Sequence, residues 1–185
     1  MKLVLGLGNP GRKYEGTRHN VGFAVAAELA RRHATGRPRT GFQAELIEAD
    51  LSGQRVLLLL PQTFMNLSGT SALAARDFYK LPNEDLLVVC DDFNLPLGKL
   101  RLRGQGSAGG QKGLADILRR LGTEDVPRLR IGVGPVPTSW DPVDFVLSRF
   151  TKNELPEIDL SVMRAADAAI VWATEGLQES MNRYN

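Results

Sequence analysis

Two histidines are the only imidazole side chains available for acid–base chemistry in this sequence. His19 lies at the start of a segment with helical periodicity, where the positive end of the helix dipole favours a neutral imidazole near physiological pH. His33 lies at the far end of the same segment beside Arg31 and Arg32, where a solvated surface position is expected. His19 is therefore the candidate general base. The plainer alternative is that a single histidine at a helix start has no chemical role.

Asp91 and Asp92 follow an apolar run at 86–90, and ligand-binding groups of open α/β sheets usually lie at such strand ends. Successive side chains of an extended chain point to opposite sides, so at most one of the two can share a site with His19. Metal binding by the pair is the competing interpretation. Because there are two histidines and no close acid–histidine spacing, a metal centre is not expected. No cofactor is expected either. Cys90 is expected to be an inert, buried thiol.

Asn9 and Asn66 each lie at the junction of an expected element, where a carboxamide offers both a donor and an acceptor to another amide. Either could equally be a turn or cap residue. Asn9 also belongs to the stretch 6–11, which matches the glycine fingerprint of dinucleotide-binding proteins. Pro10 and Gly11 delay the helix whose amides would meet a pyrophosphate, so that interpretation is disfavoured.

The elements that must position these residues follow from apolar periodicity and turn residues. The expected elements are a strand at 2–7, a helix capped by Thr17 or Asn20 and ending near His33, a hairpin of strands 42–50 and 54–60, a helix at 66–80, strands at 86–90, 99–103 and 129–133, a helix opened by the Gly-rich loop 104–110, and a long closing helix with Thr151 and Glu154 as its capping box. This order predicts one α/β domain over residues 1–185, with a mixed, partly parallel, twisted sheet flanked by helices.

Composition excludes several classes of protein. The chain has 185 residues, of which 43% are hydrophobic and 24% charged, as in globular proteins and unlike disordered or collagen-like chains. Its longest aliphatic run, 56–60, is far shorter than the ~20 residues that a membrane-spanning helix needs. The N-terminal apolar run is too short for a secretory signal, so a cytoplasmic protein is expected. The single cysteine cannot form an internal disulfide.

Charge is distributed unevenly. Residues 1–39 hold eight basic and two acidic residues, and residues 99–130 hold eight and three, whereas residues 140–185 hold four and eight. Two basic segments that share one face would attract a polyanion such as a nucleic acid, although solvated helix faces are the alternative.

Five stretches occur in order over nearly the whole chain: LGLGNPGRKYEGTRHNVGF, PQTFMNLSG, VVCDDFNLPLGKLRLR, GSAGGQKGL and LRIGVG. Together they resemble the bacterial-type peptidyl-tRNA hydrolases. The resemblance implies a single α/β domain with a mixed sheet, a metal-free esterase site, and peptidyl-tRNA as the substrate. The reaction would be hydrolysis of the ester that joins a peptide, or an N-blocked amino acid, to the 3′ ribose of tRNA.

By motif position, the resemblance implies that His19 is the catalytic histidine and Asp91 its orienting carboxylate. It implies that Asn9 and Asn66 are the amides that fix the substrate. Ester hydrolysis needs a water molecule deprotonated as it attacks, so His19 is expected to act as general base while Asp91 fixes its tautomer. Asn9 or Asn66 could donate a hydrogen bond to the developing oxyanion.

The resemblance further implies that Tyr14 and Met65 line the peptide groove. It implies that Arg101, Arg103 and Arg130 contact tRNA at its acceptor stem and 3′ end. No protein partner and no membrane contact are implied, and a monomer is expected. The alternative is a noncatalytic RNA-binding relative of the same fold, which would keep the basic face without cleaving the ester.

The chain departs from the family pattern in its glycine loop, where Gln111 and Lys112 replace a usual His-Asn pair. Lys112 keeps a donor, loses the acceptor of asparagine, and adds a charge that could meet a phosphate. We expect Lys112 to bind substrate, with turnover slowed or gated differently rather than abolished.

Overall fold

A mixed sheet of seven strands forms the centre of the molecule, in the order β2-β3-β4-β1-β5-β7-β6; the computed structural model describes residues 1–185. The strands are β1 (Lys2–Gly6), β2 (Arg39–Gly41), β3 (Ala44–Leu51), β4 (Gln54–Pro61), β5 (Leu86–Pro96), β6 (Leu100–Arg103) and β7 (Arg128–Gly134). β1 pairs in parallel with β4 and β5, and β5 pairs in parallel with β7, whereas β2–β3, β3–β4 and β6–β7 are antiparallel. The predicted fold class is confirmed.

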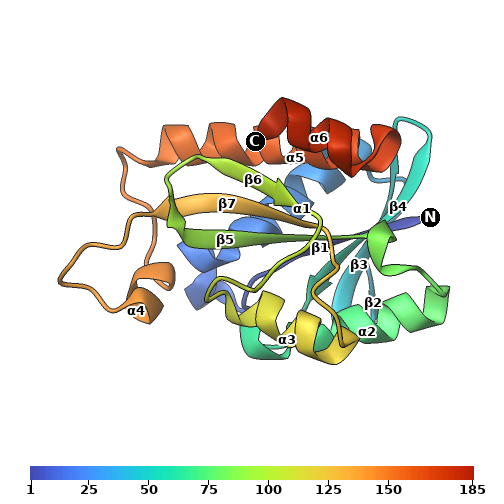
Figure 1. Cartoon of the computed structure of the whole chain (residues 1–185), viewed down its shortest axis with the longest axis horizontal. Helices are drawn as coiled ribbons and strands as arrows, with labels where there is room; N and C mark the ends of the chain where they lie inside the picture. The colour runs from blue at the N-terminus through green and yellow to red at the C-terminus, as the bar shows by residue number, and fades with distance from the viewer.

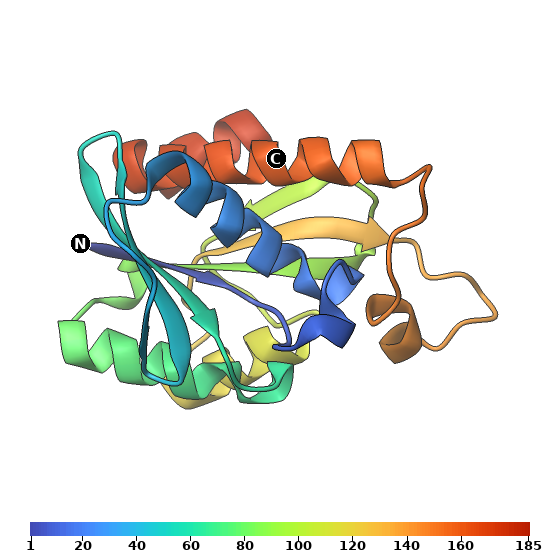
Figure 2. The ribbon, with the colours of Figure 1, turned by 180° about the vertical axis from the view of Figure 1, so that it is seen from behind.

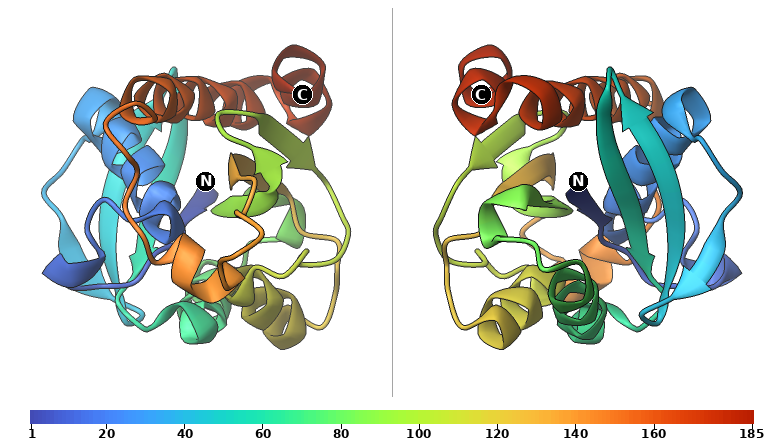
Figure 3. Two further views of the ribbon diagram at one scale, coloured as in Figure 1. Left: turned by 90° about the vertical axis from the view of Figure 1, so that its left-hand side faces the viewer. Right: turned by 90° about the vertical axis from the view of Figure 1, so that its right-hand side faces the viewer.

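Helices cover both faces of this sheet (Figures 1 and 3). One face carries α1 (Val21–His33), α5 (Leu155–Glu175) and α6 (Leu177–Tyr184), and the other carries α2 (Ser68–Tyr79) and α3 (Lys112–Leu121). Figure 2 shows α1 lying against α5. The short helix α4 (Pro142–Val146) lies at the end of the sheet far from the N-terminus. None of the helices has the length and hydrophobicity that crossing a lipid bilayer requires.

Two apolar clusters fill the space between the sheet and its two helical layers. The alternation of side chains along the strands divides the buried residues between them. On β5, Leu87 and Val89 belong to the cluster beneath α1 and α5, and Val88 and Cys90 belong to the cluster beneath α2 and α3. Four one-turn 3-10 helices lie in the connections: η1 (Arg12–Tyr14), η2 (Arg18–Asn20), η3 (Met65–Leu67) and η4 (Asn83–Asp85).

Helix α1 lies very close to the first strand because glycines face each other there. A Cβ built on Gly6 would be 2.4 Å from the carbonyl oxygen of Gly22, and a Cβ on Gly22 would be 2.5 Å from the backbone nitrogen of Leu7. Any larger residue would push the helix away. The first glycine of the fingerprint-like stretch therefore serves helix packing. Since α1 begins only at Val21, the stretch does not open a helix as a dinucleotide fold requires.

The structure differs from the sequence prediction at the end of β5 and at the end of the chain. β5 continues through Asp91 and Asp92 to Pro96, because backbone pairing with β7 persists where the apolar run stops. The two carboxylates thus lie within the strand rather than after it. The closing helix is divided at Gly176, whose φ of 96° is incompatible with helix.

Replacing Gly22 with alanine tests the close approach of α1 to the sheet. The added methyl group would overlap backbone atoms of β1 and β5, so we expect Gly22→Ala to lower the free energy of unfolding by about 1–3 kcal/mol. Urea denaturation measures the change. Gly36→Ala is the control, because nothing lies within 4 Å of a Cβ there, and a change within about 0.5 kcal/mol is expected. Equal stability of the two variants would contradict the proposed packing.

Candidate active site

His19, Asp91 and Lys112 lie toward the sheet end where β1, β5 and β7 finish, the edge at which open α/β sheets usually bind ligands, whereas Arg103 lies level with the start of β7. A cleft of about 130 Å³ opens there between β5, the start of α3, and α4. It is lined by His19, Asp91, Asp92, Phe93, Gly109, Gly110, Gln111, Lys112, Pro142, Val143 and Val146.

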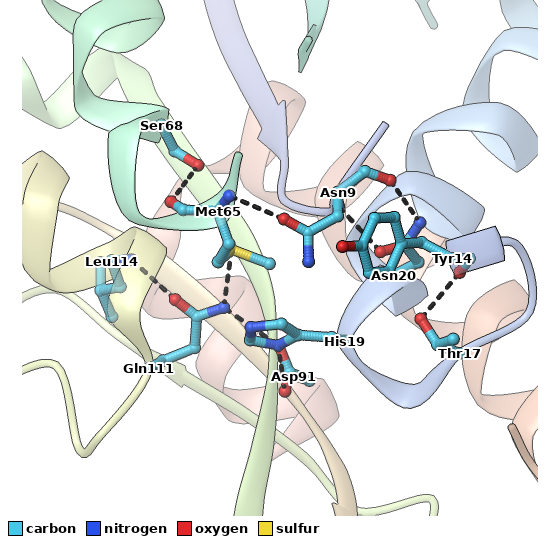
Figure 4. A network of polar contacts seen from close by, with 10 residues as sticks. All are labelled: Asn9, Tyr14, Thr17, His19, Asn20, Met65, Ser68, Asp91, Gln111 and Leu114. Atoms are coloured by element: carbon cyan, nitrogen blue, oxygen red, sulfur yellow. Dashed lines mark hydrogen bonds and ion pairs between the residues drawn. The ribbon is translucent and has the colours of Figure 1, made fainter. Parts of the chain in front are cut away.

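His19 and Asp91 are in direct contact at the base of this cleft (Figure 4). The Nδ1 atom of His19 lies 2.9 Å from both carboxylate oxygens of Asp91, and both residues are buried, at 8% and 2% exposure. A carboxylate can only accept here, so Nδ1 carries a proton, and in the neutral imidazole the free lone pair is on Nε2. Nε2 makes no hydrogen bond within the protein. The arrangement is that of a base oriented by a carboxylate.

Asp92 is the next residue of the strand, and its carboxylate bonds to groups other than His19. Its Oδ2 lies 3.2 Å from Nη1 of Arg130 on the neighbouring strand β7, and its Oδ1 accepts a hydrogen bond from the backbone of Asn94. Only Asp91 contacts His19, although both acids line the cleft.

Asn9 is held by two other residues that leave one end of its amide free. Its Oδ1 accepts a hydrogen bond from Met65 N at 2.7 Å, which directs its Nδ2 away from Met65 (Figure 4). Its backbone N–H donates to Oδ1 of Asn20, and its carbonyl accepts from Nδ2 of Asn20, at 2.8 and 2.9 Å. The free Nδ2 is therefore a hydrogen-bond donor of fixed orientation, and it lies on the side of Asn9 that faces His19 (Figure 4).

Asn20 occupies the predicted N-cap position of α1, but neither it nor Thr17 caps the helix with its side chain. Asn20 uses its whole side-chain amide on Asn9 and makes no cap bond. The hydroxyl of Thr17 donates to the backbone oxygen of Tyr14 instead. The contact of Asn20 with Asn9 was not predicted from the sequence. An asparagine before a helix is equally suited to cap that helix and to bond the backbone of another residue.

Gln111 and Lys112, where the chain departs from the family pattern, occupy different environments. Gln111 is 6% exposed and contacts Asp91, Met65 and the backbone of Leu114. Lys112 is exposed, lines the cleft, and also lines a shallow hollow beside it. The contact between Gln111 and Asp91 had no signal in the sequence.

Asn66 and Tyr14 do not line the His19 cleft. Asn66 is exposed and lines the neighbouring shallow hollow together with Lys112, Ala115, Asp116 and Arg119. Tyr14 is half-buried on the side of Asn9, and the ammonium of Lys13 lies 4.8 Å from its ring centroid. Asn9 does not line the cleft either, but it is connected to it, because its Oδ1 accepts from Met65 N and the sulfur of Met65 contacts the cleft residue Gln111.

The three predicted tRNA-contacting arginines are also not equivalent. Arg101 and Arg103 are exposed on the edge strand β6, where they alternate with the buried Leu100 and Leu102. Arg130 is only 15% exposed, and its guanidinium is bonded to Asp92 and to the backbone oxygen of Ser107. Arg130 thus holds the glycine loop in place, a role that sequence reasoning missed.

Arg128 has a similar internal role. Its side chain is fully buried and donates to the backbone oxygens of Val126, Gly106 and Glu124. Burial lowers the pKa of Arg128 from its ordinary value, although the guanidinium stays charged at neutral pH. Together with Arg130, this residue fixes the loop that ends at Gln111.

Arg18 anchors the segment that carries His19, and sequence reasoning missed it as well. Its guanidinium forms a two-pronged ion pair with Glu154, with N–O distances of 3.1 and 2.9 Å. It also lies against the rings of Phe145 and Phe150, at 4.4 and 4.8 Å from their centroids. Glu154 accepts a further bond from the backbone N–H of Thr151, which is one half of the predicted capping box.

Cys90 is completely buried beneath α2 and α3. Burial, followed by the nearby charge of Asp91, raises the pKa of its thiol, so it is not a nucleophile in the native protein. No group of three or more histidine, cysteine or acidic side chains is arranged to hold a metal ion.

Comparison with known proteins gives one consistent family. Residues 3–185 match the family model described as peptidyl-tRNA hydrolase. The chain is 54% identical to a peptidyl-tRNA hydrolase of Rhodopirellula baltica, covering 100% of this chain and 97% of that protein, and 49% identical to that of Chloroflexus aggregans, covering 100% and 99%. The crystal structure of peptidyl-tRNA hydrolase from Acinetobacter baumannii superposes with a TM-score of 0.93 at 32% identity, covering 100% and 94%.

The Arg18–Glu154 pair predicts a specific dependence of stability on pH. Burial acts to raise the pKa of Glu154, but hydrogen bonds from Arg18 and from the Thr151 backbone outweigh it and lower the pKa below the ordinary 4.5. The stabilisation is therefore present above pH 4.5 and is lost as the pH falls through the lowered value. We expect Glu154→Gln to reduce the free energy of unfolding at pH 7 by about 1–3 kcal/mol and to weaken its fall at acid pH.

The matched control is Glu175→Gln. Glu175 pairs with Arg183 at the surface, where both side chains are 45% exposed, so its loss should change stability by less than about 1 kcal/mol. Urea denaturation at several pH values measures both variants. If the two lost the same stability at pH 7, the special role of Glu154 would be excluded.

Proposed function

Because the chain belongs to the peptidyl-tRNA hydrolase family, we propose that it hydrolyses the ester bond of peptidyl-tRNA and releases the peptide and free tRNA. The observation that carries this proposal is the buried contact between His19 Nδ1 and Asp91, which turns Nε2 away from the carboxylate at a residue lining the cleft. A water molecule between Nε2 and the ester carbonyl would be deprotonated as it attacks. Asp91 would hold the tautomer and stabilise the imidazolium that forms.

Asn9 is the proposed donor to the oxyanion that develops on the ester carbonyl. Its Nδ2 is free, while its Oδ1 is held by Met65 N at 2.7 Å. The orientation of the amide is thus set before substrate binds, which is what makes such a donor effective. When the tetrahedral intermediate collapses, the 3′ oxygen of the ribose leaves and takes the proton from His19.

The peptide part of the substrate is proposed to meet Tyr14 and Met65, and Lys112 and Asn66 are proposed to bind substrate beside the reacting bond. Recognition of the peptide backbone favours an acylated nitrogen. An ordinary aminoacyl-tRNA presents an ammonium group there, which would leave the amide-binding groups mispaired. This distinction would spare the aminoacyl-tRNA pool.

Contact with tRNA is proposed to depend on exposed basic side chains along β6. Arg101 and Arg103 are free to meet phosphates, whereas Arg130 is proposed to support the site through Asp92 and the glycine loop. No base-stacking aromatic cluster lines the cleft, so affinity should be largely independent of tRNA sequence.

Hydrolysis of an N-acetylated aminoacyl-tRNA in the presence of a chelator tests the proposed chemistry. We expect His19→Ala to lower kcat by about 10²–10⁴-fold, because general-base assistance is lost. His33→Ala removes the other histidine, at the far end of α1, and should leave kcat unchanged. A wild-type protein that binds tRNA but releases no amino acid would instead be a noncatalytic RNA-binding relative.

Salt dependence tests the proposed phosphate contacts. With about three or four contacts, log affinity for tRNA should fall against log salt concentration with a slope of order −2 to −4. Arg101→Ala and Arg103→Ala should each reduce that slope by about one. Arg55→Ala, an exposed residue of β4 near the N-terminus, is the control and should leave the slope unchanged. A wild-type affinity independent of salt would contradict the assignment.

A further inference from the structure

Gln111 joins the His19–Asp91 pair to the start of α3. It is the N-cap residue of α3, and its Oε1 accepts a hydrogen bond from Leu114 N at 2.7 Å. The other end of the same amide, Nε2, lies 3.0 Å from Asp91 Oδ1 and 3.3 Å from the sulfur of Met65 (Figure 4). One side chain therefore completes the helix and contacts the carboxylate that orients His19.

The orientation of this amide is determined by its partners. A backbone N–H can only donate, so the oxygen of Gln111 must face Leu114, and the NH₂ group must face Asp91. The flipped amide would place two donors together at Leu114 and two oxygens together at Asp91. Helix α3 thus dictates that Asp91 receives a hydrogen-bond donor.

That donor acts on the atom that also faces His19. Asp91 is 2% exposed, and its Oδ1 lies 2.9 Å from His19 Nδ1 as well as 3.0 Å from Gln111 Nε2. A buried carboxylate must have its oxygens hydrogen-bonded. With Gln111 in place, the carboxylate plane is fixed from two sides. Without it, the carboxylate could rotate, and the imidazole would lose the partner that keeps its proton on Nδ1.

The space around Gln111 matches this role. A Cβ on Gly113 would be 2.5 Å from the sulfur of Met65 and 3.1 Å from Gln111 Oε1. Only glycine at this position lets the first turn of α3 lie against Met65 and Gln111 together. Lys112 lies between Gln111 and Gly113 in the sequence and lines the cleft, so the same turn carries a proposed substrate contact.

We propose that Gln111 is a positioning residue, which acts through Asp91 to hold His19 in the tautomer with a free Nε2. Its consequence for turnover rests on the proposed hydrolase function. The tautomer itself is a property of the free protein and can be measured without substrate.

Gln111→Ser is the test variant. Serine is a good N-cap and can still accept from Leu114 N, but its hydroxyl is too short to reach Asp91. We expect kcat to fall about 10-fold with KM within twofold, as for the loss of a hydrogen bond to a charged group. Gln111→Asn keeps a capping amide that is one methylene shorter, and we expect the same fall in kcat for it. It replaces the serine variant if that variant does not fold.

Nuclear magnetic resonance of the protein labelled with ¹⁵N-histidine measures the tautomer of His19. This tautomer would not change if Gln111 only stabilised helix α3. The chain has two histidines, so His33 serves as an internal reference. When the neutral imidazole is observed at alkaline pH, His19 of the wild-type protein should show one protonated Nδ1 and one unprotonated Nε2. In Gln111→Ser, we expect a mixture of the two tautomers.

Gly122→Ala is the matched control for loss of helix stability. Gly122 ends α3 with a φ of 70°, so an alanine there strains the opposite end of the same helix without touching Asp91. This variant should keep the wild-type tautomer and kcat. An unchanged tautomer in both Gln111 variants, or the same tautomer change in Gly122→Ala, would overturn the inference. A wild-type protein with the expected tautomer but no hydrolysis would overturn only the proposed function.

Discussion

A carboxylate that is removed from water must find hydrogen-bond donors within the protein, and Asp91 finds them in His19 and Gln111. These donors come from the segment after β1 and from the start of α3, while Asp91 itself lies on β5. Burial of one negative charge therefore requires three distant segments to meet at one end of the sheet. The same contact gives His19 its tautomer, so the requirement of stability and the requirement of chemistry coincide.

The segment that carries His19 is fixed from several directions. Arg18 anchors it to Glu154 at the start of α5, Asn20 clamps it to the backbone of Asn9, and the short distance between Gly6 and Gly22 holds α1 on β1. Each contact removes a different freedom of motion. Such pre-organisation is what a general base and an oxyanion donor need, since a displacement of ~1 Å can reduce their contribution substantially.

Basic residues serve two separate purposes in this molecule. Arg128 and Arg130 are turned inwards and hold the glycine loop through its backbone oxygens, whereas Arg101 and Arg103 remain exposed on an edge strand. The two groups lie on paired strands, with Arg101 opposite Arg130 and Arg103 opposite Arg128. Charge counted along the chain therefore overstates the surface available to tRNA, because part of it stabilises the loop beside the site.

The order of apolar runs and turn residues determined the longer strands and helices and the α/β class, because the period of apolar residues shows which side of an element is buried. It did not predict the short elements β2 and α4 or the division of the closing helix at Gly176. Motif positions led to His19, Asp91 and Asn9. The contacts of Gln111, Asn20, Arg18 and Arg130 were decided only by the tertiary structure. The Arg18–Glu154 pair, for example, joins residues 136 positions apart, and whether two such side chains meet depends on how every intervening loop turns. Residue type limits what these side chains can bond to, and folding alone selects the partner.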